Sequence, residues 1–217
     1  VYQYDFAIES LCNHFNTKSL KGFGVEKLKD GLVSAGAIMH YLSETQHQKI
    51  NHITSINRIP KDDYIWMDGF TIKNLEIFQS FSREGKSLID VIDKTISPMG
   101  GRLLKRWVAL PSKNIKLIRN RHLTVKYLID NETALSSIQE NIKEIGDLER
   151  LISKVATGKI NPREVVQLKN SLAAIEPIKK LLKKSKAKSL KELSNSLDNC
   201  NQLRKLIEKT LNEEAPV

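Results

Sequence analysis

Hydrophobic residues recur every three or four positions over most of this chain of 217 residues, and this spacing restricts the fold more than any other feature. Such intervals collect side chains on one face of a helix, whereas a half-buried strand alternates every second residue. The spacing predicts long helices over residues 115–129, over 132–156, from Asn161-Pro162 to about Leu182, and from Ser189 to about Ile207. Each helix has an apolar stripe and a charged back, so we expect a mainly α fold, an antiparallel helical bundle.

An earlier helix is predicted over residues 25–46, and small residues crowd its middle. They are Gly31, Ser34, Ala35, Gly36 and Ala37. A glycine inside a helix costs about 1 kcal/mol relative to alanine. We therefore expect another backbone to pack closely against this helix and to compensate for that cost.

Polar residues that favour helix starts mark the shorter helices. Ser97-Pro98 combines a capping serine with a proline where no amide hydrogen bond is needed, and its helix should run to about Leu110. Asp68 is expected to cap a short helix that ends at Phe78. Ser87 is expected to cap a helix over Leu88–Asp93, with Asp90 in its third position. Ser189 and Glu192 are expected to form a capping box.

The one β-like stretch covers residues 52–68. Residues 53–59 and 64–67 are rich in β-branched and aromatic side chains and flank a polar turn at 60–63. This pattern predicts one short β-hairpin, which must pack on the helices because an isolated hairpin is marginally stable.

The net charge of +10 fits either a nucleic-acid partner or lysine-rich, solvated helix faces, and charge alone does not decide between them. Its most concentrated part is a run of lysines without an acid, made of Lys179, Lys180, Lys183, Lys184, Lys186, Lys188 and Lys191. This run either contacts a phosphate backbone or is a solvated turn. Aromatic residues make up only 6% and are not interleaved with the cations, so a stacking platform for single strands is not expected.

Cysteine use and hydrophobic runs indicate the compartment. Cys12 and Cys200 lie far apart, which suits a reducing cytoplasm. No apolar run approaches the roughly 20 residues that span a bilayer. The chain begins without a signal-peptide pattern and without Met, so we expect a cytoplasmic protein and a piece cut from a longer chain.

No set of residues in the sequence converges on catalysis. Gly85-Lys86-Ser87 matches the end of a phosphate-binding P-loop, but Ser80 stands where that motif needs another glycine, and no strand is expected before it. The histidines form no i,i+4 pair and no Cys-x-x-Cys occurs, so a zinc site lacks support. We therefore expect no enzyme activity, no cofactor and no metal in this chain.

Five stretches, taken in order, resemble the MutS family of DNA mismatch repair proteins. They are residues 15–46, residues 67–76, residues 88–107, Asp147-Leu148-Glu149-Arg150, and Asn161-Pro162-Arg163-Glu164. The tail at 213–217 is similar to the exit before the family's clamp arms. The family usually has Asp where Glu164 stands. One such motif would be weak evidence, but five in the right order are specific.

The resemblance implies a domain plan. Residues 1–20 are similar to the end of the connector domain, and residues 21–217 to the first part of the core, or lever, domain. In the family, the mismatch-reading domain precedes this region, and the clamp and the ATPase follow it. The parent protein would use ATP and magnesium, bind mismatched duplex DNA with a second identical subunit, and work in the cytoplasm on the nucleoid.

By this resemblance the segment transmits conformational change between the DNA-binding and ATPase parts. The candidates for structural or transmitting roles are Pro98, Gly100, Arg102, Trp107, Asp147, Glu149, Arg150, Pro162 and Arg163. Trp107 is expected to be a core anchor. The charged candidates either lock helices together or form surface pairs worth about 0–1 kcal/mol each.

An independent basic helical module that binds nucleic acid is the alternative function. Its weak phosphate contacts would come from Lys183, Lys184, Lys186 and Lys188. A transmitting segment should bind DNA weakly or not at all, whereas a binding module should bind with a steep dependence on salt.

Overall fold

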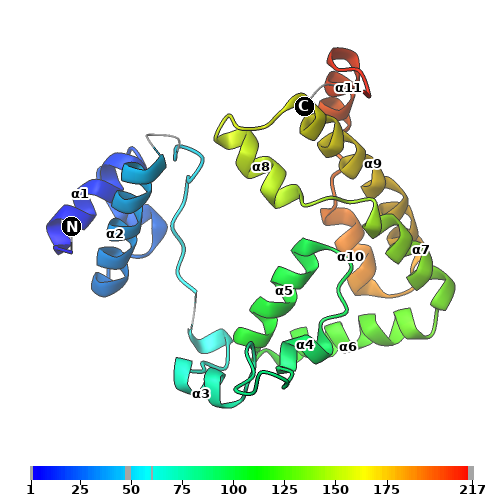
Figure 1. Ribbon diagram of the computed structural model, residues 1–217, viewed down its shortest axis with the longest axis horizontal. Coiled ribbons are helices and arrows are strands. Elements are labelled where there is room, and N and C mark those ends of the chain that lie inside the picture. The colour runs from blue at the N-terminus through cyan, green and yellow to red at the C-terminus, as the bar shows by residue number, and fades with distance from the viewer. Residues whose placement is uncertain (1, 47–49, 60, 215–217) are drawn as a thin grey trace. The chain divides into compact units, whose positions relative to one another are not determined.

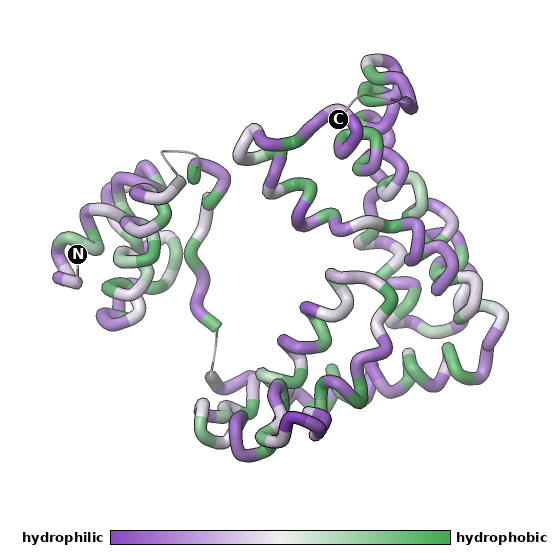
Figure 2. Tube along the Cα trace, viewed as in Figure 1, coloured by the Kyte–Doolittle hydropathy of each residue, from purple (hydrophilic) through white to green (hydrophobic). Residues whose placement is uncertain are grey.

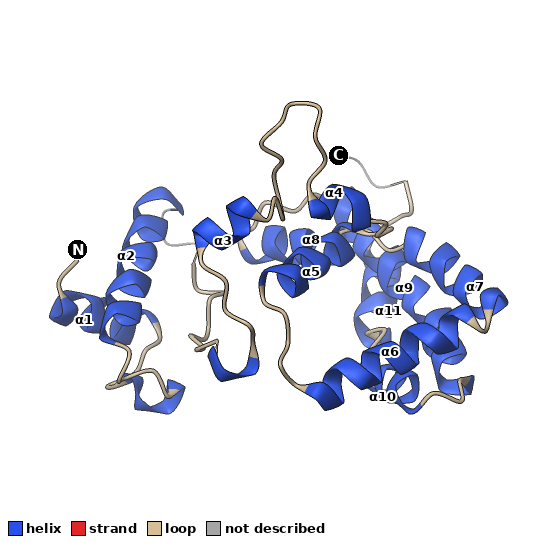
Figure 3. Ribbon diagram, turned by 90° about the horizontal axis from the view of Figure 1, so that it is seen from below, coloured by secondary structure: helices blue, strands red, loops and turns tan. Residues whose placement is uncertain are grey.

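The computed structural model describes residues 2–46, 50–59 and 61–214 (Figure 1). This described part contains helices and no strand, as Figure 3 shows, which confirms a mainly α fold. None of its helices is long and apolar enough to cross a membrane. The chain divides into two compact units, residues 1–60 with 152–159, and residues 61–151 with 160–217.

Two α-helices and a 3-10 turn form the core of the first unit. They are α1 (Tyr4–His14), η1 (Leu20–Phe23) and α2 (Lys29–Gln46). Apolar side chains from all three meet in one buried cluster that includes Leu11, Leu20 and Leu32. The expected close approach occurs at Gly36, where an added Cβ would lie 2.6 Å from the Cβ of Ala7 on α1. The helix at residues 4–14 was not predicted.

The predicted hairpin over residues 52–68 is wrong. The Ile53 carbonyl accepts a hydrogen bond from His14 Nε2 at 2.8 Å, and residues 53–59 form no β-ladder. Residues 61–63 form the 3-10 turn η2 (Lys61–Asp63), and Pro60 lies outside the described residues. Tyr64 instead forms an isolated antiparallel bridge with Ser112. β-propensity showed that these residues suit extended backbone, but it could not identify their partners.

Three short helices open the second unit: α3 (Gly69–Asn74), α4 (Leu88–Ile92) and α5 (Pro98–Ala109). The expected caps are present on all three, with Asp68, Ser87 and Ser97 each accepting an N–H bond from the first turn. The first of these helices ends earlier than the predicted Phe78, because Glu76 adopts a left-handed φ of 47°. Its carboxylate then accepts the N–H of Phe81 at 2.6 Å and fixes the following loop.

The longest helix, α9 (Pro162–Lys184), organises the rest of the second unit. It begins with the predicted Asn161-Pro162 start and contacts α7 (Glu132–Lys143), α10 (Lys188–Ser196) and α11 (Asn201–Thr210). One buried cluster holds Leu168, Leu172 and Ile175, and a second holds Ile178, Leu182 and Leu190. Burial of each such side chain contributes about 1.5–3 kcal/mol.

Two of the long helices are interrupted where continuous helices were predicted. The segment 132–156 is split at residues 144–147 into α7 and α8 (Leu148–Ala156). The last predicted helix is split at residues 197–200, where Cys200 has a left-handed φ of 48°. The Ser189–Glu192 capping box is absent because α10 begins at Lys188, two residues before the Leu190 start that a Ser189 cap would give. The Ser189 hydroxyl bonds to Thr124 instead.

Hydrophobic residues also run along α5 and α6 (Ile115–Ile129), as Figure 2 shows. The bounds of α6 agree with the predicted helix 115–129. Neither helix contains a buried residue, whereas α9 contains seven. The apolar stripes of α5 and α6 are therefore only partly covered within the second unit.

Candidate functional site

The start of α5 is fixed by its own sequence. The Ser97 hydroxyl accepts the N–H of Gly100 at 3.1 Å, and Pro98 occupies the first turn. A Cβ added to Gly100 would lie 3.1 Å from Ser97 Oγ, so a larger residue would crowd the cap. These contacts hold the first turn in place and set the direction of the next side chain, Arg102.

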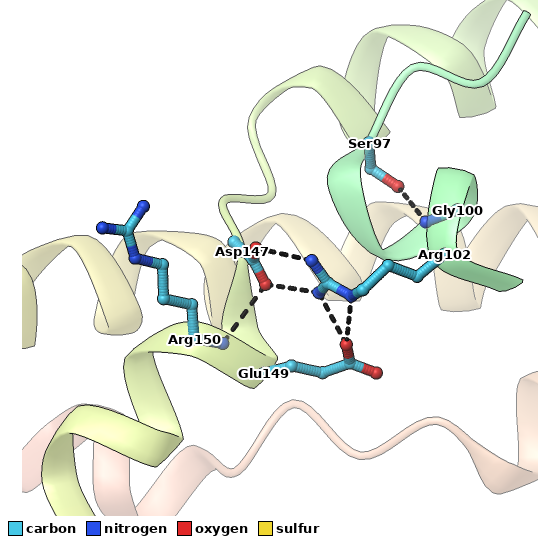
Figure 4. Close-up of polar contacts among 6 residues, drawn as sticks. All are labelled: Ser97, Gly100, Arg102, Asp147, Glu149 and Arg150. Carbon is cyan, nitrogen blue, oxygen red and sulfur yellow. Dashed lines mark hydrogen bonds and ion pairs between the residues drawn. The ribbon is translucent and has the colours of Figure 1, made fainter. Parts of the chain in front are cut away.

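Arg102 reaches from α5 to the segment between α7 and α8 (Figure 4). Its Nη1 and Nη2 donate to the two carboxylate oxygens of Asp147 at 2.9 and 2.7 Å, and its Nε donates to Glu149 Oε2 at 2.7 Å. The planar guanidinium offers parallel N–H donors to Asp147 and a further donor to Glu149, a fixed fork geometry that a lysine ammonium lacks. We call Arg102, Asp147 and Glu149 the ionic junction.

Asp147 also caps a helix. Its Oδ1 accepts the N–H of Arg150 at 3.2 Å, which satisfies one of the first amides of α8. Its side chain is 21% exposed, compared with 48% for Arg102 and 67% for Glu149, so Asp147 is the best shielded member. One carboxylate therefore joins α5 to the first turn of α8.

The residue before Asp147 anchors the same segment to α9. Gly146 donates its N–H to the hydroxyl of Ser171, which is 1% exposed, at 3.0 Å. A Cβ added to Gly146 would lie 3.0 Å from Gln167 Nε2, so the approach suits glycine. The ionic junction and this anchor together tie α5, α8 and α9 to one four-residue segment, 144–147.

The charges of the junction reinforce each other. Hydrogen bonds from Arg102 lower the pKa of Asp147 and outweigh the opposing effect of burial, and the N–H of Arg150 and the charges of the two arginines lower it further. Hydrogen bonds to Asp147 and then to Glu149 raise the pKa of Arg102. Both partners therefore remain ionised at neutral pH, as an electrostatic link requires.

Arg150 and Arg163 do not join the junction. The side chain of Arg150 points away from Asp147 in Figure 4, and its hydrogen bond to Asp147 comes from the backbone N–H. Arg163 is exposed in the first turn of α9, next to Pro162, and forms no ion pair with another described residue. Glu164, which stands where the resemblance leads one to expect Asp, is the reciprocal half of that helix's capping box, and its carboxylate accepts the Asn161 N–H at 3.2 Å.

Trp107 is not the predicted core anchor within this chain. It is 42% exposed, and the guanidinium of Arg121 lies over its ring at 3.6 Å from the ring centre. The prediction failed because helical spacing shows which side chains share a face but does not show what covers that face.

The lysine run surrounds the end of α9 and the turn before α10. Lys183, Lys184, Lys186 and Lys188 are exposed, and Lys188 lies 3.8 Å from Glu192 on the next turn of its helix. Lys179 differs from them because its Nζ donates to the Leu197 carbonyl at 2.7 Å and so supports the break between α10 and α11.

The loop with the P-loop-like residues is committed to local structure. Ser87 is fully buried, and its hydroxyl donates to Asp90 at 2.7 Å within the capping box of α4. A Cβ on Gly85 would overlap Ser80 Oγ at 2.1 Å, so the loop closes on itself. Among the described residues, no three His, Cys, Asp or Glu side chains form a group that could hold a metal ion.

Sequence reasoning missed Gly146 and Ser171, which hold the junction segment on α9. A glycine inside the periodic stretch 132–156 was the available signal, since an isolated glycine lowers the expectation of a helix. Nothing in the sequence pointed to Ser171, which is a polar residue on an otherwise apolar helix face.

These contacts define a helical segment whose main site is a structural ionic junction. Two family models match this sequence: MutS domain III matches residues 70–217, and MutS domain II matches residues 2–54. The chain belongs to the MutS family.

Individual relatives extend the match to the whole chain. The chain is 57% identical over 217 residues to the DNA mismatch repair protein MutS of Flavobacterium psychrophilum, and equally to that of Flavobacterium johnsoniae. The protein of the same name from Christiangramia forsetii is 53% identical over the same length. Each alignment covers 100% of this chain and 25% of the relative, so the chain spans a quarter of the length of these proteins.

Proposed function

We propose that this chain is a structural core segment of a MutS-type DNA mismatch repair protein. In this role it transmits conformational change between parts that bind mismatched DNA and parts that hydrolyse ATP. The observation that carries the proposal is the ionic junction, where Arg102 of α5 binds Asp147 and Glu149 beside α8. Family membership supplies the context, because the matched relatives are named DNA mismatch repair proteins.

A junction of this kind suits transmission for a physical reason. Coupling between distant sites needs rigid elements whose contacts change together. A displacement of α5 would pull on the carboxylate that also caps α8, and the Gly146–Ser171 bond would carry the same displacement to α9. Packed helices transmit such movement because their interiors are nearly incompressible.

The other candidates support the junction or face outward. Pro98 and Gly100 hold the first turn that positions Arg102, and Pro162 fixes the start of α9. Arg150 and Arg163 extend exposed guanidinium groups toward solvent, where they can form ionic contacts with other parts of a longer protein. The partly uncovered stripes of α5 and α6, with Trp107, suit the same kind of contact.

The parent protein would supply the remaining activities. ATP and magnesium, mismatched duplex DNA and a second identical subunit belong to that parent in our proposal, as does a place in the cytoplasm on the nucleoid. This segment would act without a cofactor and without catalysis. We also retain residues 1–20 as the end of the connector domain and 21–217 as the core domain.

Arg102→Ala in the intact protein tests the proposal. The quantity to measure is the coupling free energy, obtained from the change in ATP turnover when mismatched DNA is added. We expect weaker coupling, with basal turnover and DNA affinity near those of the wild type. Arg83→Ala is the matched control, because that arginine is also exposed, lies in the loop between α3 and α4, and has no ion-pair partner among the described residues. Equal coupling in the wild type and Arg102→Ala would refute the proposal.

A further inference from the structure

One stretch of the second unit carries cations without any acid. Residues 94–129 contain nine Lys and Arg residues and neither Asp nor Glu. The stretch includes α5 and α6, and α6 contributes Lys116, Arg119, Arg121 and Lys126. It is therefore a second basic region, separate in sequence from the lysine run.

Three of the cations on α6 share one face. A helix turns by about 100° per residue, so Lys116, Arg119 and Lys126 fall within an arc of about 80°. All three are exposed, and none has an ion-pair partner within the described ranges. Leu123 lies inside the same arc, so this face continues into the cleft that Leu123 lines.

The lysine run forms the opposite wall of that cleft. The cleft has a volume of about 440 Å³ and lies between α6, which contributes Lys126, and the start of α10, which contributes Lys186 and Lys188. Thr124 Oγ1 and Ser189 Oγ lie 2.6 Å apart and hold the two walls together. The fold thus brings together two basic segments that are about sixty residues apart in the sequence.

The acids of the cleft do not cancel this charge. Asp130 and Glu192 also line it, and Glu192 pairs with Lys188 at 3.8 Å. Four further exposed cations lie on the elements around the cleft: Lys116 and Arg119 on α6, and Lys183 and Lys184 at the end of α9, which packs against α10. We call the surface made of Lys116, Arg119, Lys126, Lys183, Lys184, Lys186 and Lys188 the basic groove.

We propose that the basic groove binds the sugar-phosphate backbone of duplex DNA without regard to sequence. The ten-residue interval from Lys116 to Lys126 spans about 15 Å along α6. That length corresponds to about four base pairs, so the row of cations can follow one strand. Lysines position a duplex through phosphate contacts and carry no base information.

Duplex DNA explains this surface better than the other polyanions. A single-strand site would show aromatic side chains for stacking, but Tyr127 is the one aromatic residue lining the cleft. A site for an acidic protein would combine its cations with a desolvated apolar centre. The groove instead carries exposed cations along one face of α6 and along the turn before α10, an arrangement that suits contacts with successive phosphates.

The proposal can be tested on this chain with a fluorescent, fully paired duplex of 30 base pairs. Anisotropy titrations over a range of salt concentrations should give a dissociation constant on the order of 10⁻⁵ M at low salt. The variant combines Lys116→Gln, Arg119→Gln and Lys126→Gln. Loss of three phosphate contacts should reduce the slope of log K against log salt by about 2–3 and weaken binding about tenfold or more.

The matched control combines Lys18→Gln, Lys21→Gln and Lys27→Gln, which removes the same charge from exposed lysines of the first unit. We expect the control to weaken binding less than about threefold at any salt concentration. Its lysines would not contact the duplex, and dissolved salt screens the attraction between charges that are far apart. Equal losses in both variants would overturn the proposal. So would displacement of the duplex by polyglutamate at equal charge concentration, which would assign the groove to acidic proteins.

Two further arms keep the proposal separate from the proposed function. Circular dichroism must show the same helix content in both variants, and the α6 substitutions in the intact protein should lower the same salt slope on paired duplex. The proposal rests on the proposed function only in taking DNA as the parent's partner. If the α6 substitutions weaken duplex binding and leave mismatch coupling normal, the result supports DNA binding by the basic groove and leaves the proposed function untouched. If duplex affinity and the slope of log K against log salt stay normal both in this chain and in the intact protein, DNA binding by the groove is excluded.

Discussion

Asp147→Ala should destabilise the second unit more than the same change at Arg102 or Glu149, the more exposed members of the ionic junction. The substitution removes the cap on the Arg150 N–H and both hydrogen bonds from Arg102. Loss of a helix cap costs about 0.5–2 kcal/mol, and a solvent-screened ion pair adds little to that. We therefore expect the free energy of unfolding to fall by about 1–2 kcal/mol, most of it from the cap.

Asp147→Asn separates the two contributions. Asparagine keeps an oxygen that can cap α8 but has no charge for Arg102, so its cost should be less than about 1 kcal/mol at neutral pH. The hydrogen bonds from Arg102 hold the pKa of Asp147 below its ordinary value. The charge therefore stabilises the folded state above the ordinary aspartate pKa of about 4, and this contribution is lost as pH falls through the lower folded value.

Urea denaturation followed by circular dichroism at pH 7 and in steps toward pH 3 measures both effects. The difference in unfolding free energy between the wild type and Asp147→Asn should be largest at pH 7 and shrink with acid. Asp68, Asp90 and Asp93 also have lowered pKa values from hydrogen bonds, but their contributions cancel in this difference. A difference that stays constant with pH, or an alanine variant as stable as the wild type, would refute this reasoning.

Three further substitutions test packing. Trp107→Ala should lower the free energy of unfolding by less than about 2 kcal/mol, because the ring is 42% exposed. Leu172→Ala in the buried cluster should lower it by about 2–5 kcal/mol. Equal losses in urea unfolding would place Trp107 in a core. Gly36→Ala should destabilise the first unit by about 1–3 kcal/mol through its clash with Ala7, and Gly22→Ala, which meets no atom within 4 Å, is its control in thermal melts. Arg150→Ala should change the free energy of unfolding by less than about 0.5 kcal/mol, because the backbone N–H of residue 150 still donates to the Asp147 carboxylate. A larger loss would show that the Arg150 side chain makes a contact of its own.

Local signals in the sequence predicted the capped helix starts correctly, except at Ser189. Ser97-Pro98 and Asn161-Pro162 begin helices as expected, and Ser87 with Asp90 forms a capping box. These signals succeed because a cap is satisfied within three or four residues of itself. Glu164 shows the same rule, since the longer acid still closes the capping box of α9.

Features that depend on distant residues could not be predicted in this way. The break at 144–147 is stabilised by the Gly146 bond to Ser171, twenty-five residues further along the chain. The extended residues 64 and 65 pair with the segment at 111–112 and not with the nearby residues 53–59. Helical and strand periods carry no information about such partners, so a continuous helix and a hairpin were the expected but incorrect results.

The candidate site was predicted as a set of residues but not as a geometry. Arg102, Asp147 and Glu149 were all chosen from the family resemblance, and the structure brings these three together. Arg150 and Arg163 were chosen on the same grounds and lie outside the junction. Charge type and family motif could not distinguish the junction residues from the two arginines outside it. Which arginine pairs with Asp147 depends on the orientation of α5, which its cap determines.

A double-mutant cycle on mismatch coupling tests the central claim most directly. Arg102→Ala, Asp147→Ala and the double variant are compared with the wild type in the intact protein, and the coupling free energy between mismatched DNA and ATP turnover is measured for each. Allosteric coupling is typically about 1–3 kcal/mol. If the junction transmits, each single change should remove at least half of the coupling, and the second change should add almost nothing to the first. Losses that simply add, or coupling that survives in the double variant, would contradict transmission through this junction.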